Sequence, residues 1–278
     1  MSSVFLMLGV TLCYTITSLS DKYAVSEAKF TRNEFTFLMC SSMSVFIALT
    51  LPFQKLHFTF SWQSFVAIFL VIVCKMLEFQ MSALVLKQLS AFELKAWLGL
   101  TLFASYFTDV IYGEKLYVIK IICICFTAVG LIFIANSAKE SKKEYRKICI
   151  PLILYLVSKY GYGLIIKSFS PYICSTLQLL PALVIISAIL LVKVTPAEIF
   201  KKNSQGALKV ILARIPNSAG MLMENAVISE SLVNYSFIQP LILIVLFIIG
   251  LIKKENHSVL NIVGGIICVI GVLTFQIV

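Results

Sequence analysis

Long apolar runs recur along the whole chain, from residue 3 to residue 277, and this recurrence restricts its folds more than any other feature. A helix needs about 20 apolar residues to cross the hydrocarbon core of a bilayer, which is about 30 Å thick. Hydrophobic residues make up 60% of the sequence and charged residues 13%, whereas ordinary soluble domains carry about 25% charged residues. No stretch is left for a sizeable soluble domain, so the sequence predicts an all-α membrane protein.

Ten segments are long and apolar enough to cross a membrane, and polar or helix-breaking turns separate them. Pro52–Lys55 ends the second segment, Gly113–Lys115 follows the fourth, and Ser137–Lys147 is the longest polar stretch. The first apolar run has neither a basic start nor a small-residue cleavage site, so we expect a retained helix. The predicted membrane-spanning helices cover residues 3–20, 35–53, 62–86, 91–110, 117–136, 148–168, 172–192, 207–228, 232–252 and 259–277.

Basic residues are distributed unevenly between the two sets of connections. The odd-numbered connections carry fifteen Lys and Arg residues and the even-numbered ones carry four. Cytoplasmic loops of membrane proteins are enriched in Lys and Arg. The charge count therefore places the odd connections in the cytoplasm and both termini outside. We expect a multi-pass protein of the cell membrane, with an organelle membrane as the alternative.

Several function classes find no support in the sequence. The net charge of +10 follows from the basic loops of a membrane protein, so we expect no nucleic-acid partner. The eight cysteines form no CxxC pair and the two histidines, His57 and His257, fall in predicted loops. We therefore expect no disulfide framework, no metal site and no cofactor. Nucleotide-binding loops and hydrolase motifs are absent from the sequence, so we do not expect an enzyme.

An internal repeat divides the chain into two halves. A shift of 141 residues aligns Glu114–Leu131 with Glu255–Val272 without a gap, with glycines Gly130 and Gly271 in register. The sequence predicts a first five-helix repeat over residues 1–137, a charged linker loop over 138–147 and a second repeat over 148–278. Because five is odd, the second unit must be inverted in the membrane. Transporters with inverted repeats bind substrate near the bilayer midplane, where the units meet.

The repeated motifs resemble the drug/metabolite transporter superfamily, EamA type. The resemblance implies ten helices, a central cavity and alternating access, and it places both termini in the cytoplasm, opposite to the charge count. The first unit departs from the family pattern, because Gly99 occupies the position that aligns with Pro240. The motifs that carry the resemblance are Leu89-Ser90-Ala91, Gly113-Glu114-Lys115 and Ala128-Val129-Gly130 in the first unit, and Ser231, Pro240, Lys254-Glu255 and Ile270-Gly271 in the second.

Charged side chains inside the predicted spans are the candidate site. A charge at the bilayer centre costs about 2.5–3.5 kcal/mol, so it indicates a cavity or an ion pair. Lys159 and Arg214 lie near span centres without a carboxylate three or four residues away. We expect both to face a net-basic cavity that binds a carboxylate or phosphate. The candidate substrate-binding residues are Lys75, Glu78, Lys95, Tyr155, Lys159, Arg214, Asn217 and Glu224.

Structural interpretations of some of these residues stay open. Lys75 and Glu78 are spaced to form a pair on one helix face, Lys95 can extend to the membrane surface beside Glu93, and Tyr155 can serve packing alone. The predicted function is a secondary-active transporter of a small anionic or zwitterionic metabolite. We expect a proton or counter-substrate as coupling partner, membrane lipid as surroundings, and a monomer or homodimer. The alternatives are a flippase for a phosphate-bearing lipid and, less favoured, an intramembrane enzyme.

Overall fold

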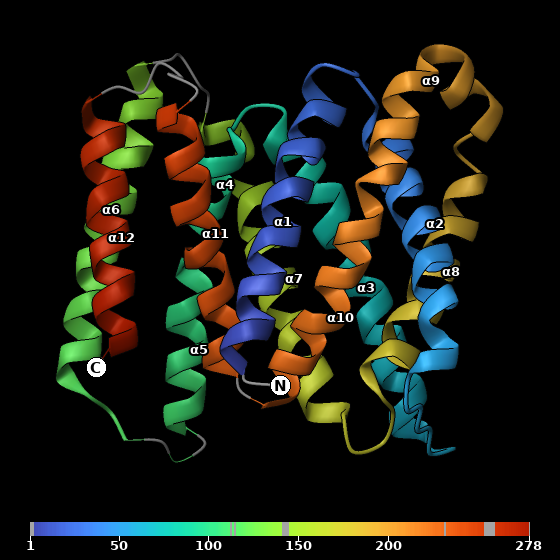
Figure 1. Cartoon of the computed structure of the whole chain (residues 1–278), viewed down its shortest axis with the longest axis horizontal. Helices are drawn as coiled ribbons and strands as arrows, with labels where there is room; N and C mark the ends of the chain where they lie inside the picture. Colours follow the sequence, from blue (N-terminus) through green and yellow to red (C-terminus); the bar gives the residue numbers. More distant parts are fainter. Residues whose placement is uncertain are drawn as a thin grey trace.

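The computed structural model describes residues 3–111, 113, 115–140, 145–230, 232–252 and 259–277, and these form a bundle of helices (Figure 1). The charge-rich segments 141–144 and 253–258, with Glu114 and Ser231 of the sequence motifs, lie outside the described residues. The helices are α1 (Ser3–Ser26), α2 (Arg32–Thr50), the 3₁₀ turn η1 (Leu51–Phe53), α3 (Trp62–Leu86), α4 (Ala91–Leu98), α5 (Leu100–Ile111), α6 (Val118–Glu140), α7 (Tyr145–Phe169), α8 (Ser175–Leu191), α9 (Pro196–Leu212), α10 (Arg214–Glu230), α11 (Leu232–Ile252) and α12 (Val259–Ile277).

Several of these helices are suited to a bilayer. In the described part of the chain, Arg32–Phe53, Trp62–Leu86 and Lys147–Phe169 are long and apolar enough to span a membrane. A fourth span is obtained if Ser175–Leu191 and Pro196–Ser229, which bend by 109° at their junction, count as one. The chain is thus a membrane-embedded protein.

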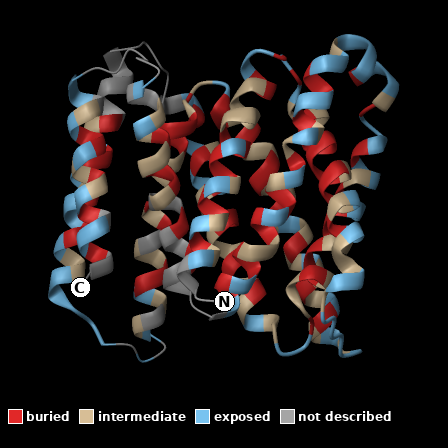
Figure 2. Ribbon diagram, in the orientation of Figure 1, coloured by how far each residue is buried: buried red, intermediate tan, exposed pale blue. Residues whose placement is uncertain are grey.

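The exposed helix faces are apolar, as a lipid environment requires. On α3 the exposed side chains Phe65, Phe69 and Val73 follow one another at helical spacing, and on α7 Ile153 and Val157 do the same. Exposed positions run along the height of the outer helices in Figure 2. Stripes of this extent are rare on soluble monomers, whereas they match the surface of a helix in contact with lipid.

Each of the ten predicted segments coincides with helical structure, but two of them are broken. The segment 91–110 divides at Gly99 into α4 and α5, and the segment 207–228 divides at Ala213 between α9 and α10. Pro216 explains the second break, because it has no N–H to offer the carbonyl of Leu212 and its ring crowds that carbonyl. Arg214 therefore lies at the start of a helix and not in the middle of one.

Other boundaries also differ from the expectation. The helix α1 continues to Ser26, six residues beyond the predicted end at residue 20, and so includes Asp21. The predicted linker loop 138–147 is helical at both described ends, since α6 runs to Glu140 and α7 begins at Tyr145. The helix α9 kinks at Asn203, whose φ of −160° and ψ of 83° are not helical.

The central helices pair across the two halves of the chain. The helix α3 packs against α7, α1 packs against α10, and α2 packs against α8. At one edge of the bundle α6 packs against α12 (Figure 1). Both chain termini lie at the end of the bundle opposite α9. This arrangement surrounds the middle of the molecule with α1, α3, α7 and α10.

Candidate functional site

A polar cavity lies among α1, α3, α4, α7 and α10. Its open volume is about 70 Å³, which exceeds the roughly 10–15 Å³ that a single buried water needs. A space of this size admits the carboxylate, phosphate or ammonium group of a small metabolite. Its polar lining consists of Tyr14, Thr17, Ser18, Asp21, Lys75, Glu78, Ser82, Lys95, Tyr155, Lys159 and Asn217.

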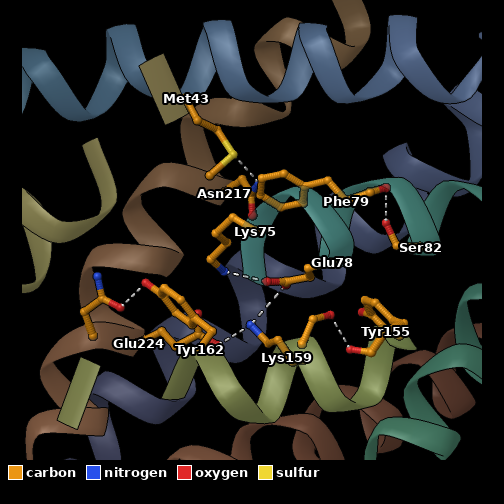
Figure 3. Close-up of polar contacts among 12 residues, drawn as sticks. Met43, Lys75, Glu78, Phe79, Ser82, Tyr155, Lys159, Tyr162, Asn217 and Glu224 are labelled. Atoms are coloured by element: carbon orange, nitrogen blue, oxygen red, sulfur yellow. Dashed lines mark hydrogen bonds and ion pairs between the residues drawn. The ribbon is translucent and has the colours of Figure 1, made fainter. Parts of the chain in front are cut away.

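A chain of ion pairs on the wall of this cavity connects the two halves of the sequence (Figure 3). The Lys75 Nζ atom lies 2.7 Å from Glu78 Oε2 on the same helix. The Lys159 Nζ atom, on α7, lies 3.6 Å from Glu78 Oε1 and 2.9 Å from Glu224 Oε1 on α10. The hydroxyl of Tyr14, on α1, donates to Glu224 Oε2 at 2.5 Å. Lys159 is therefore shared by carboxylates from both halves.

Aromatic rings surround the two lysines and compensate part of their loss of water. The Lys75 ammonium lies 3.5 Å from the centre of the Tyr162 ring, which is close enough for a cation–π interaction. The Tyr162 hydroxyl donates to Asn225 Oδ1 at 2.6 Å. The Tyr235 hydroxyl donates to the Lys159 carbonyl at 3.0 Å. These bonds fix the rings, so the ion pairs are held in one geometry.

A separate ion pair joins α10 to α1. The Arg214 Nη2 atom bonds to Asp21 Oδ1, and its Nε donates to the carbonyl of Val210 at 3.1 Å. The Arg214 side chain is fully buried and does not line the cavity, whereas Asp21 does. In this conformation Arg214 supports the wall of the cavity from behind.

Six of the eight residues expected to bind substrate line the cavity: Lys75, Glu78, Lys95, Tyr155, Lys159 and Asn217. The other two, Arg214 and Glu224, lie behind the wall and bond to residues that line it. Glu93 is the acidic residue nearest to Lys95 in the sequence. In the structure it forms a capping box with Ser90, whose N–H donates to Glu93 Oε2 at 2.7 Å.

Sequence reasoning missed Asp21 and Tyr14. The predicted first span ends at residue 20, one residue before Asp21. Tyr14 gave a signal, since the 141-residue offset aligns it with Tyr155, and both tyrosines line the cavity. Asp21 also makes the cavity less positively charged than the sequence analysis predicts. Three lysines and two carboxylates line the cavity, which leaves a formal charge of +1 on its wall.

Comparison with known proteins does not assign this chain to a family. No protein-family model matches this chain, and no curated protein matches it in sequence. Among the described residues, no group of three or more His, Cys, Asp or Glu side chains is placed to hold a metal ion. The cavity and the arrangement of the helices around it are therefore the features that bear on function.

Proposed function

We propose that this protein is a secondary-active transporter that moves a small anionic or zwitterionic metabolite by alternating access. The proposal includes ten transmembrane helices in two inverted five-helix units and membership of the EamA-type drug/metabolite transporters. The observation that carries it is the buried charged cavity, in which Lys159 of the second half bonds to Glu78 of the first half and to Glu224 of its own. Substrate sites of inverted-repeat transporters lie where the two units meet.

The packing of the helices supports two related units. The offset of 141 residues places α7 over α1, α8 over α2, α10 over α3, α11 over α4 and α5, and α12 over α6. Exchanging each helix for its counterpart turns the α3–α7 contact into the α10–α1 contact, and both contacts are present. The α2–α8 and α6–α12 contacts map onto themselves. A bundle with a pseudo-twofold axis has this pattern.

Two glycines support the same relationship at atomic detail. A Cβ atom added to Gly130 would lie 2.7 Å from Gly264 O and 2.7 Å from Cys268 Sγ. A Cβ atom added to Gly271 would meet Cys123 O at 3.2 Å and collide with the Thr127 side chain. Positions 264 and 268 follow 123 and 127 by 141 residues, the offset that separates the two glycines. The two contacts are therefore equivalent under exchange of the halves, and small residues at such crossings allow close helix packing in membranes.

The network offers a way to couple substrate binding to a change of conformation. A carboxylate or phosphate entering the cavity can replace Glu78 or Glu224 at Lys159, because each of these carboxylates has a second partner in Lys75 or Tyr14. A ligand shifts a conformational equilibrium only through such differential contacts. Protonation of either glutamate would have a similar effect on Lys159, which makes both carboxylates candidates for proton coupling.

The two ends of the bundle differ, as one state of an alternating-access cycle requires. Towards α9, Lys22 Nζ donates to the carbonyls of Leu86 and Leu89 at 2.6 and 3.0 Å, and Asp21 bonds to Arg214. Towards the other end lies a larger hollow that reaches Asn225. Two of the four described buried side-chain atoms without a hydrogen-bond partner lie on α10 beyond Arg214: Ser218 Oγ and Asn225 Nδ2. Buried polar groups are normally bonded, so this face of α10 is our candidate for the path.

A ligand screen followed by transport measurements tests the proposal. We expect one class among amino acids, sugar phosphates and nucleotide sugars to raise the unfolding temperature of the purified protein with increasing concentration. The same compound should enter proteoliposomes carrying the protein, and Lys159→Met should abolish its uptake. Lys201→Met, at an exposed position on α9, is the matched control and should retain uptake. Undiminished uptake by Lys159→Met would contradict the proposed site, and movement of a lipid-linked compound alone would favour a flippase.

A further inference from the structure

A second, larger hollow opens at the end of the bundle opposite α9. Its open volume is about 550 Å³. It lies between the α2–α3 connection, the α7–α8 connection and the far end of α10, and we call it the vestibule. Lys55, His57, Cys174, Thr176 and Asn225 are among the residues that line it. None of these residues except Asn225 belongs to the network around Lys159.

Hydrogen bonds between the two connections give the vestibule a fixed shape. The His57 Nε2 atom lies 2.8 Å from the Ser170 carbonyl, and the Cys174 N–H donates to the His57 carbonyl at 3.0 Å. The Thr176 hydroxyl donates to Gln54 Oε1 at 2.5 Å. These bonds hold the α2–α3 connection, which carries Lys55, against the α7–α8 connection, which carries Cys174.

The electrostatic character of the vestibule favours an anion. Lys55 and His57 line it, and no carboxylate is among its described lining residues. The helix α8 begins at Ser175 in its wall, and its N-cap residue, Cys174, makes no capping bond with its side chain. The first N–H groups of a helix lack partners within the helix and carry a partial positive charge, so they attract anions.

An unused donor points independently to a ligand. The Asn225 side chain is only 2% exposed and lines the vestibule. Its Oδ1 accepts the hydrogen bond from Tyr162, whereas its Nδ2 has no partner among the described residues. A buried donor left without a partner costs about 1–3 kcal/mol. An oxygen atom of a bound ligand would remove that cost.

We infer that the vestibule binds the anionic group of a ligand, a phosphate or a carboxylate, between Lys55, the start of α8 and Asn225 Nδ2. Asn225 connects this site to the central cavity, because Tyr162 bonds to it and lies against Lys75. Identifying the ligand with the transported substrate rests on the proposed function, whereas binding of an anion does not. The anionic group can come from a soluble metabolite or from a lipid headgroup.

Cys174 supplies a reporter inside the vestibule. We would keep Cys174 as the sole cysteine, replace the other seven by alanine, and measure its modification by a membrane-impermeant maleimide in nanodiscs of zwitterionic lipid. Saturating inorganic phosphate should slow the modification at least about fivefold, whereas sodium chloride at equal ionic strength should not. Equal protection by both salts would overturn the proposal. If the single-cysteine variant fails to fold, wild-type protein with Cys174 quantified by peptide mass spectrometry gives the same measurement.

Substitutions in the vestibule test which side chains bind the anion, and a change of lipid tests whether the anion is soluble or a lipid headgroup. Asn225→Ala and Lys55→Gln should each abolish most of the phosphate protection, whereas Lys201→Gln at the opposite end should retain it. Retained protection in both vestibule variants would overturn the assignment of the site. Protection by anionic lipid in the nanodisc, without added phosphate, would identify a headgroup as the ligand, and protection by phosphate alone would identify a soluble one. Because labelling needs no transport, phosphate protection without any uptake would contradict the proposed function and leave the anion site intact.

Discussion

The thiol of Cys268 donates to the carbonyl oxygen of Thr127 at 3.5 Å, and these two residues are 141 positions apart in the sequence. In the proposed inverted repeat, the same offset relates the two halves of the chain. A residue in contact with its own counterpart lies close to the axis that exchanges the two units. The α6–α12 contact is therefore where the proposed inverted repeat is most directly testable.

Leucine at either glycine of this contact should separate α6 from α12. At Gly130 the added side chain meets the backbone oxygen of Gly264, which cannot move aside without shifting the helix. We expect Gly130→Leu and Gly271→Leu to lower the stability of the protein by similar amounts, about 1–3 kcal/mol each. Thermal unfolding in detergent measures both. Val129→Leu, on the exposed face of α6, is the control and should change little; a large difference between the two glycine variants would argue against equivalence.

Lys159→Met should be more destabilising than Glu224→Gln. Removing the lysine deprives Glu224 of its cation, and breaking a buried pair from one side costs about 3–5 kcal/mol. Removing the charge of Glu224 leaves Lys159 with Glu78 at 3.6 Å, so the loss should be smaller. The double variant should recover part of the loss, and a double-mutant cycle of unfolding free energies measures this coupling. If the two losses of unfolding free energy were strictly additive, the Lys159–Glu224 pair would contribute no coupling energy to stability.

Arg214→Met should reduce stability more than it changes substrate affinity. Arg214 is buried behind the cavity and bonds to Asp21, so its removal leaves that carboxylate without its partner. We expect a lower unfolding temperature, with the KM of the folded protein changed by no more than about twofold. The variant Asp21→Asn combined with Arg214→Met should regain part of the stability. A large increase in KM at wild-type stability would instead identify Arg214 as a direct substrate ligand.

The two ends of the bundle should be accessible from opposite sides of the membrane. Lys55 lies in the α2–α3 connection and Lys201 lies on α9 at the other end. We expect cysteines introduced at these positions to react with an impermeant reagent from opposite sides. The positive-inside rule places the α9 end in the cytoplasm, whereas the family resemblance places the termini there. Modification of position 201 in intact cells would contradict the charge rule and agree with the resemblance.

The amino-acid sequence was sufficient to predict the helical, membrane-embedded character of this protein and most residues of its candidate site. The hydrophobic effect and the need to bond every backbone group leave few other structures for such apolar runs, so the ten predicted segments all coincide with helix. Lys75, Glu78, Lys159 and Glu224 were found because a charge in an apolar segment is costly. The sequence analysis did not predict the helix breaks at Gly99 and Ala213. Its spans rest on the apolar composition of whole segments, which does not change when a single backbone hydrogen bond of the helix is lost.

Which charged side chains form pairs follows only from the packing of the helices. Glu224 joins Lys159 across 65 positions of sequence and Asp21 joins Arg214 across 193, and no local pattern encodes a pairing at such distances. These contacts depend on how α1, α7 and α10 pack, which fixes the side chains that share a desolvated space. Packing therefore joins buried charges from distant segments into a network, places Arg214 behind the cavity wall, and brings Asp21 to the cavity.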